Sequence, residues 1–228
     1  LCQDMGYCVT WGLMNSAAYG APQIRERVIF IGCLDGHFVW PEPTHSQHGT
    51  DSKQKWVTLE RAIKGLKEAQ PLYKEFSDSI CKYLKLIPEG ANWRALPRNL
   101  QAGAIGAAFK SWGGRSGFLR RLSWEKPAPT ITNNPKTRAT MLCHPTLNRP
   151  LSVRECARIQ QFPDMWKFHG SVAAQYQQIG NAAPVALGEA IGYAIGVVAK
   201  RANKGPHRKK LYCAEPDLLR RIIKSPKT

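Results

Sequence analysis

Residues 149–163 read RPLSVRECARIQQFP, and no other stretch defines its local fold as clearly. Ser152 and Glu155 have the spacing of a capping box, in which a hydroxyl and a carboxylate satisfy free backbone amides at the start of a helix. The sequence therefore predicts a helix from about residue 153 to 161. Phe162-Pro163 should end it, because proline cannot continue a helix.

Regular elements are expected on both sides of this helix. Residues 7–13 (YCVTWGL) and 27–33 (RVIFIGC) are short and rich in β-branched and aromatic side chains, which predicts two strands. Apolar residues recur at helical spacing in 59–66 and again in 72–87. A last helix should begin near Pro184, since proline suits the first helical turn.

The charge is distributed unevenly along the chain. The net charge is +17; residues 44–148 hold 17 basic and seven acidic side chains, whereas residues 1–43 hold two and four. Residues 200–228 add ten basic and two acidic side chains. Lys and Arg release counterions from phosphates, so the middle of the chain suits a nucleic acid partner. A merely solvated basic surface is the alternative, and composition alone weighs the two about equally.

Several other classes of feature are not expected. The uncharged stretch 170–188 is long enough to span a membrane, but its three glutamines, asparagine and proline would be disfavoured in hydrocarbon. The chain opens without the basic start of a signal peptide. Seven cysteines with no CxxC pair favour reduced thiols in a cytoplasmic setting, the bacterial cytosol or nucleoid. No metal site is predicted, because no paired-cysteine motif is present.

Three separated stretches resemble motifs of cytosine-C5 DNA methyltransferases, and a fourth resembles the target-recognition region of that family. Residues 14–27 (MNSAAYGAPQIRER) resemble the family's NAxxYGxPQxRxR segment, and residues 149–163 its RPLTxREaARxQxFP motif. Residues 175–184 (QYQQIGNAAP) are similar to its closing QYxQIGNAVP motif, and residues 120–131 (RRLSWEKPAPTI) resemble its target-recognition region. The motifs keep the family's order, so the chain is identified as a member over roughly residues 5–200.

The resemblance implies an α/β fold: an incomplete edge of the mixed sheet of an S-adenosylmethionine methyltransferase, joined to a small, mostly irregular target-recognition domain. The expected division is 1–43 for the edge strands, 44–148 for the recognition domain, 149–180 for the RPLSxRE hinge motif, 181–200 for a helix returning to the catalytic domain, and 201–228 for a basic extension.

The resemblance also assigns roles in catalysis. Arg27 is expected to meet the negative charge that develops at O2 of the target cytosine, and Arg25 to hold the flipped nucleotide and its phosphates. Residues two apart on an extended chain face the same side, so these two guanidiniums should act together. Asn181 and Ala182 match the family's contacts to S-adenosylmethionine, the implied cofactor. The competing interpretation is that Asn181 simply caps a helix.

Duplex DNA is the partner that the family implies. Thr130 is expected near the vacated base position or the target phosphate, and about a third of the basic candidates are expected to touch DNA. The candidate contacts are Gln23, Arg115, Arg120, Arg121, Lys126, Thr130, Lys136 and Arg138. Arg149, Arg154 and Arg158 are instead interpreted as structural.

Some motifs of the family have no match here. These are its Gly-rich cofactor loop, its Pro-Cys-Gln nucleophile loop and its Glu-Asn-Val motif. Cys2 is rejected as the nucleophile, because the preceding proline is absent and the residue lies directly before a strand that the family places after that loop. The preferred hypothesis is the second subunit of a split methyltransferase, with the nucleophile on a companion polypeptide. A truncated fragment is the alternative.

Two other functions stay open on the sequence. One is a DNA-binding module without chemistry, and the other is half of an RNA cytosine-C5 methyltransferase. The basic middle segment suits all three hypotheses.

Overall fold

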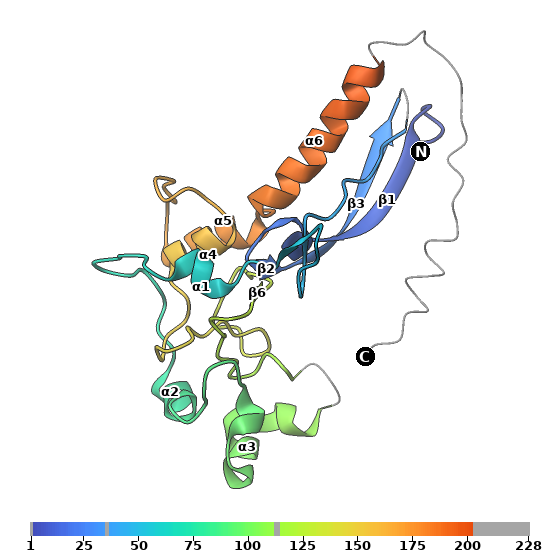
Figure 1. Ribbon diagram of the computed structural model, residues 1–228. Helices are drawn as coiled ribbons and strands as arrows, with labels where there is room; N and C mark the ends of the chain where they lie inside the picture. Colours follow the sequence, from blue (N-terminus) through green and yellow to red (C-terminus); the bar gives the residue numbers. More distant parts are fainter. Residues whose placement is uncertain (1, 35–36, 112–114, 203–228) are drawn as a thin grey trace. The chain divides into compact units, whose positions relative to one another are not determined.

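The structure, a computed structural model, describes residues 2–34, 37–111 and 115–202 (Figure 1). The chain divides into two compact units. Within the described residues, the first unit comprises 2–13, 27–41 and 191–202, and the second comprises 14–26 and 42–190. Most of the basic extension expected at 201–228 lies outside the described residues.

The first unit is a small sheet with a helix. β1 (Cys8–Asn15) and β3 (Glu26–Cys33) form a two-stranded sheet, which confirms both predicted strands. α6 (Val185–Ala202) begins directly after Pro184, as predicted, and its residues from 191 onward belong to this unit. The buried cluster of this unit is small: Phe38, Ala194 and Val198, with Ile31, Cys33 and Trp40 packed against it.

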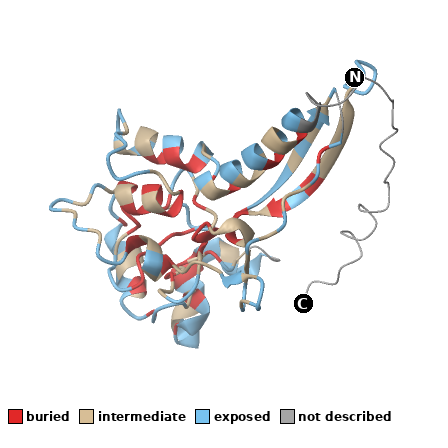
Figure 2. Cartoon of the chain, turned by 45° about the horizontal axis from the view of Figure 1, so that its top comes forward, coloured by how far each residue is buried: buried red, intermediate tan, exposed pale blue. Residues whose placement is uncertain are grey.

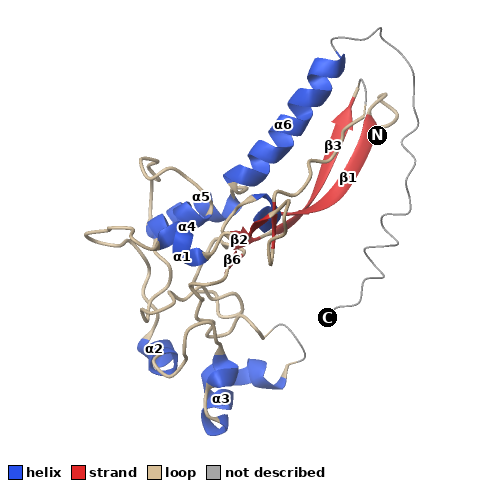
Figure 3. Ribbon diagram, viewed as in Figure 1, coloured by secondary structure: helices blue, strands red, loops and turns tan. Residues whose placement is uncertain are grey.

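The second unit is built of short elements joined by long loops (Figure 3). Its helices are α1 (Leu59–Ile63), α2 (Asp78–Leu84), α3 (Arg98–Ile105), α4 (Val153–Ile159) and α5 (Val172–Asn181), with 3-10 turns η1 (Ser16–Tyr19), η2 (Trp93–Ala95) and η3 (Gly106–Lys110). Two pairs of two-residue strands complete it: β2 (Gln23–Ile24) with β6 (Ala128–Pro129), and β4 (His45–Ser46) with β5 (Gln54–Lys55).

Two hydrophobic clusters support the second unit, whose buried residues are red in Figure 2. The first includes Leu59, Leu122, Ile131, Leu142, Val153, Cys156, Ile159, Tyr176 and Ile179. The second includes Phe76, Leu84, Trp93, Leu96, Ile105, Leu119 and Met141. Since the first cluster draws on both 44–148 and 149–180, these segments share one core. The division in the structure therefore does not coincide with the boundaries expected from the sequence.

The helix predicted at about 153–161 is present as α4, together with its N-terminal cap. Ser152 is the N-cap of α4: its hydroxyl accepts from the amide of Glu155 at 3.0 Å, and the Glu155 carboxylate accepts from the Ser152 amide at 2.7 Å. Both halves of the predicted capping box are therefore formed, and each satisfies an amide that has no partner within the helix.

α5 was missed by the sequence analysis. Ser171 caps it by accepting from the amide of Ala174, and Val172, Tyr176 and Ile179 have the spacing of one helix face. Asn181 is consequently the last residue of α5. The competing interpretation, in which Asn181 caps the last helix, is wrong, because Asn181 ends α5 and α6 begins only at Val185.

The segment Val172–Lys200 contains an 18-residue stretch with a mean hydropathy of 1.6, which is long and apolar enough to cross a membrane by length and composition alone. They form two helices, since α5 ends at Asn181, α6 begins at Val185 and Pro184 lies between them. One such segment is weak evidence for a membrane span.

Candidate functional site

The candidate site is a junction in the second unit where the four stretches that resemble family motifs meet. β2 pairs in parallel with β6, which places Gln23 opposite Ala128 and Ile24 opposite Pro129. The motif before β2 folds back on itself, because the Ser16 hydroxyl donates to the Gln23 carbonyl at 2.8 Å. This brings the QIRER segment beside the segment around Thr130.

The buried side chain of Gln23 connects the segments of the junction through hydrogen bonds. Its side chain is fully buried; Nε2 donates to the Ile159 carbonyl at 3.3 Å and to Oε1 of Gln160 at 2.7 Å. Its Oε1 accepts from the amide of Ile131 at 3.2 Å. One amide group therefore links β2, the end of α4 and the segment after β6. Gln23 had been expected to contact DNA, but it holds the protein together at this point.

Arg25 makes the second link. Its side chain is only 6% exposed, and its two terminal nitrogens donate to the carbonyls of Ile131 and Gly180, both at 3.0 Å. A planar guanidinium suits this task because its fork presents parallel donors to two acceptors. The segment after β6 and the last turn of α5 are thus joined through one buried cation.

Close packing at Gly180 completes the junction. A Cβ at this position would lie 2.5 Å from Oδ1 of Asn133 and 2.7 Å from both the Asn133 amide nitrogen and the Thr132 carbonyl carbon. Two of these atoms are backbone and cannot move independently. Only glycine permits α5 to approach the 132–133 backbone this closely.

The sequence analysis missed one residue of the junction. Gln160 is fully buried, and its Nε2 donates to the carbonyls of Ile179 and Ala182 at 2.7 and 3.0 Å. It fixes the segment between α5 and α6. The available signal was an amide placed directly after the apolar face of α4, where a polar side chain needs buried partners.

Thr130 lies at the edge of this junction. It is half-buried, and its hydroxyl donates to the Ile24 carbonyl at 3.0 Å. Lys126, earlier in the same segment, is exposed.

Asn181 and Ala182 follow directly on the turn that Arg25 holds. Asn181 is exposed, whereas the Ala182 amide donates to the Ile179 carbonyl and its carbonyl accepts from Gln160. The side-chain amide of Asn181 can meet the carboxylate and ammonium groups of a ligand. The Ala182 backbone is already engaged within the protein, so it is less available than expected.

Arg27 lies on β3 in the first unit and is exposed. The sequence analysis had paired it with Arg25, which lies buried in the second unit. The two arginines therefore differ sharply in exposure, although they are two residues apart.

Arg121 is structural in the folded chain. It is 5% exposed and donates to backbone carbonyls of Leu84, Ile87, His144 and Leu147. This guanidinium links loops of the recognition segment, and the expectation that it touches DNA conflicts with its burial.

Four other basic candidates retain some exposure. Arg115 and Arg120 are half-buried and donate to the carbonyls of Phe109 and Met141, and burial lowers the pKa of Arg120. Lys136 is half-buried, and Arg138 is exposed and donates to the Ala104 carbonyl at 3.0 Å.

An ion pair between Arg149 and Glu155 stabilises the first turn of α4. The nitrogens of Arg149 donate to both carboxylate oxygens of Glu155 at 2.8 and 2.7 Å, in the bidentate geometry that favours Arg over Lys. His144 lies 3.6 Å from the same carboxylate, and burial lowers its pKa to about 4. Arg158 pairs with Asp164, and Arg154 donates to the carbonyls of Pro163 and Trp166. These contacts agree with the structural interpretation of the three arginines.

Free thiols occur among the described residues, whereas a cluster of metal-ligating side chains does not. Among the described residues, the thiols of Cys2, Cys33, Cys81, Cys143 and Cys156 are free, and burial raises the pKa of Cys143 to about 11. Cys8 is disulfide-bonded, so the expectation of reduced thiols does not hold for this residue. No group of three or more His, Cys, Asp or Glu side chains that could hold a metal ion occurs in the described part of the chain.

Comparison with known proteins identifies relatives for this arrangement. Residues 2–197 match the family described as C-5 cytosine-specific DNA methylase. The type II methyltransferase M.Sau96I of Staphylococcus aureus is 38% identical over 189 residues, which are 82% of this chain and 43% of the relative. M.Eco47II of Escherichia coli is 36% identical over 214 residues, 88% of this chain and 49% of the relative. The chain thus spans about half the length of the curated relatives that it matches.

One solved structure shares the fold. A crystal structure described as a DNA modification methyltransferase encoded within an E. coli prophage superposes with a TM-score of 0.52 and 22% identity, over 86% of this chain and 62% of that one. The mixed helices and small sheets are therefore those of a methyltransferase-like fold.

Proposed function

The chain belongs to the family of C-5 cytosine-specific DNA methylases, and on that premise we propose that it is the target-recognition and site-closing part of a DNA (cytosine-5)-methyltransferase. The observation that carries this proposal is the junction in which Gln23 and Arg25 join the QIRER segment to the RPLSxRE, recognition and closing motifs. Such a junction explains why these motifs occur together. Gln23 and Arg25 of the first stretch bind backbone carbonyls of each of the other three.

The proposed reaction places specific demands on the chain. A thiolate adds to C6 of cytosine, a methyl group is transferred to C5, and the thiolate leaves once the C5 proton is removed. Addition puts negative charge on O2 and N3 of the ring, and a guanidinium near O2 lowers that barrier. Arg27 has this role in our proposal, because its exposed guanidinium can meet a base that has left the duplex.

Arg25 has a different role from the one first expected. Its guanidinium donates to the carbonyls of Ile131 and Gly180 inside the protein, so we assign it to positioning the Thr130 segment and the Asn181 turn. It acts through these two segments and does not itself hold the flipped nucleotide. Thr130 lies at the edge of the junction and Lys126 is exposed in the same segment, and we place these two residues nearest the target phosphate.

S-adenosylmethionine is the proposed cofactor and supplies an electrophilic methyl group when bound. The exposed amide of Asn181 fits its amino-acid end, since a side-chain amide can both accept from an ammonium and donate to a carboxylate. The hydrogen bonds from Gln160 to the carbonyls of Ile179 and Ala182 hold Asn181 at this place.

The sulfur nucleophile comes, in this proposal, from an N-terminal methyltransferase part that carries the Pro-Cys-Gln and Gly-rich loops. The same part would complete the sheet of the first unit. Two strands rarely form a stable sheet in water, and Val28 and Phe30 on β3 are 52% and 68% exposed. Alternate residues of a strand share one face, so both side chains suit burial against further strands or helices. We propose a companion subunit as the source of this part.

Transfer of a tritiated methyl group to duplex DNA tests the proposal. The chain is assayed alone, with a companion that carries the Pro-Cys-Gln loop, and with that companion carrying Cys→Ser in the loop. Transfer only with the intact companion is expected. DNA binding without transfer under all three conditions would instead support a DNA-binding module, and transfer to tRNA in preference to duplex DNA would support an RNA methyltransferase.

A further inference from the structure

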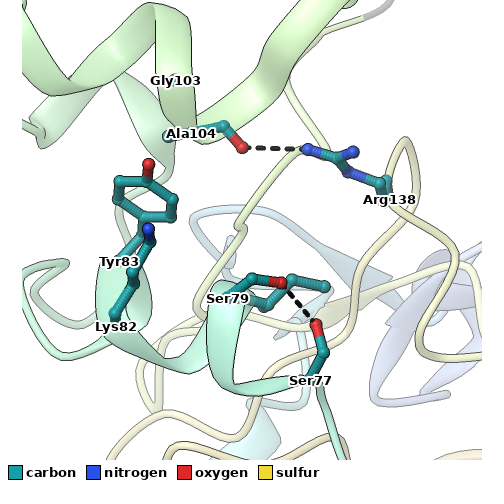
Figure 4. A pocket seen from close by; sticks show the side chains of 8 residues that line it. Ser77, Ser79, Lys82, Tyr83, Gly103, Ala104 and Arg138 are labelled. Carbon is teal, nitrogen blue, oxygen red and sulfur yellow. Dashed lines mark hydrogen bonds between the residues drawn. The ribbon is translucent and has the colours of Figure 1, made fainter.

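A cationic pocket lies in the recognition segment, between α2, α3 and the loop that holds Arg138. Its volume is about 400 Å³, and its lining includes Ser77, Ser79, Lys82, Tyr83 and Arg138 (Figure 4). None of these residues belongs to the junction formed by Gln23 and Arg25. The pocket is therefore separate from the candidate site described above.

The lining has the chemistry of an anion site. Lys82 and Arg138 supply two positive charges, while the other polar side chains are hydroxyls, and no carboxylate occurs among the described residues that line the cavity. Ammonium, guanidinium and hydroxyl groups can all donate to the oxygens of a phosphate. A ligand that presents several acceptor oxygens and a negative charge matches this set.

The cationic side chains are held near the cavity by their own contacts. Arg138 donates to the Ala104 carbonyl at 3.0 Å, which uses only one of five guanidinium donors. The Lys82 ammonium lies 4.8 Å from the centre of the Tyr83 ring, within cation–π range. Part of the conformational entropy lost on binding a ligand is therefore already lost in the folded chain.

Gly103 keeps the Tyr83 hydroxyl accessible. A Cβ on this residue of α3 would lie 3.1 Å from that oxygen, closer than ordinary contact. The Ser77 and Ser79 hydroxyls lie 2.8 Å apart on the α2 side of the cavity and are exposed. The hydroxyls thus face solvent, from which a ligand would arrive.

We propose that this pocket binds a backbone phosphate of duplex DNA, away from the flipped base. The proposal rests on the proposed function, which makes DNA the partner of the recognition segment. A phosphodiester is favoured over free phosphate because the segment 44–148 carries 17 basic against seven acidic side chains, and a polyanion engages such a surface at many points. Such a contact positions the duplex without reading its sequence.

The test measures binding of the full 228-residue chain to a fluorescent duplex by anisotropy, at several KCl concentrations. The double variant Lys82→Gln/Arg138→Gln should weaken binding about tenfold at moderate salt. It should also lower the slope of log affinity against log salt by about one, the value for one lost phosphate contact. Tyr83→Phe, which changes no charge, should weaken binding about threefold with the slope unchanged.

The matched control is Lys74→Gln/Lys85→Gln. It removes the same charge from exposed lysines near α2 that do not line the cavity. An equal loss in this control would overturn the proposal, because any basic surface would then explain the effect. Thermal melting of each variant followed by circular dichroism confirms that the chain still folds.

Two further outcomes separate the ligand from the function. If inorganic phosphate binds the wild-type chain and not Lys82→Gln/Arg138→Gln, while DNA affinity is unchanged, the pocket takes free phosphate and the proposal fails. If the wild-type chain binds no duplex DNA at all, the proposed function fails together with this inference. Wild-type binding with an unaffected double variant refutes the pocket alone.

Discussion

Replacing Arg25 and Arg27 one at a time should show that Arg25 contributes mainly to the free energy of unfolding and Arg27 mainly to methyl transfer. Arg25→Ala removes two charge-assisted hydrogen bonds, to the carbonyls of Ile131 and Gly180, and leaves both carbonyls in a buried junction. Hydrogen bonds to charged groups contribute about 1.5–3 kcal/mol each, and losses within one network are not additive. The free energy of unfolding should therefore fall by about 3–5 kcal/mol. Arg25→Lys keeps the charge but loses the fork, so about half of that loss is expected.

Arg27 provides the comparison, because it is exposed. Arg27→Ala should change the free energy of unfolding by no more than about 0.5 kcal/mol, as exposed substitutions commonly do. With the N-terminal part present, the same variant should lose about 10²–10³-fold in methyl transfer, the size expected for a lost oxyanion donor.

Urea denaturation followed by tryptophan fluorescence measures the stability, since Trp93 and Trp124 report on the second unit. Methyl transfer to duplex DNA measures the chemistry. Equal destabilisation by Arg25→Ala and Arg27→Ala would refute the reasoning, because the buried guanidinium would then contribute no more than the exposed one.

Three further predictions concern the same unit. Gly180→Ala should destabilise it by about 1–3 kcal/mol, measured in urea, because the added Cβ meets the Asn133 backbone at 2.7 Å; an unchanged midpoint would contradict the close approach. Glu155→Gln should cost about 3–5 kcal/mol in the same assay, since it leaves Arg149 without its carboxylate and weakens the α4 cap; a loss below about 1 kcal/mol would contradict this. His144 has a folded pKa of about 4, below its ordinary value of 6.5, so only the unfolded chain takes up this proton between those values. The stability that results from this pKa difference is complete above pH 6.5 and falls by up to about 3 kcal/mol as the pH is lowered towards 4. The variant His144→Asn should lose less stability over the same pH range. Identical pH profiles of stability for the two proteins would count against this role of His144.

Local sequence signals predicted the elements that begin or end at residues with a known structural preference. The capping box predicted the start of α4, short runs of β-branched and aromatic residues indicated β1 and β3, and Pro184 marked the start of α6. α5 lacked charged residues and contains three glutamines, so its composition hid the helical spacing of Val172, Tyr176 and Ile179.

The contacts between segments could not be predicted in this way. Gln23 pairs with Ala128, and Arg25 reaches Gly180, across more than 100 residues of sequence. Glutamine and arginine are ordinarily exposed, and their burial depends on carbonyls that only the folded chain supplies. Family resemblance pointed to this segment, whereas the buried contacts of Arg25 and Gln23 favour a positioning role that no local pattern indicates.

Covalent trapping tests the central claim most directly, namely that these residues position a cytosine whose attacking sulfur lies on another part of the enzyme. Duplex DNA with 5-fluorocytosine at the target position cannot release the thiolate, because fluorine blocks removal of a proton from C5. Incubation with S-adenosylmethionine, this chain and a companion carrying the Pro-Cys-Gln loop, followed by peptide mass analysis, locates the adduct. The adduct is expected only on the cysteine of the companion's loop. An adduct on Cys2, or on any cysteine of this chain in the absence of the companion, would contradict the account.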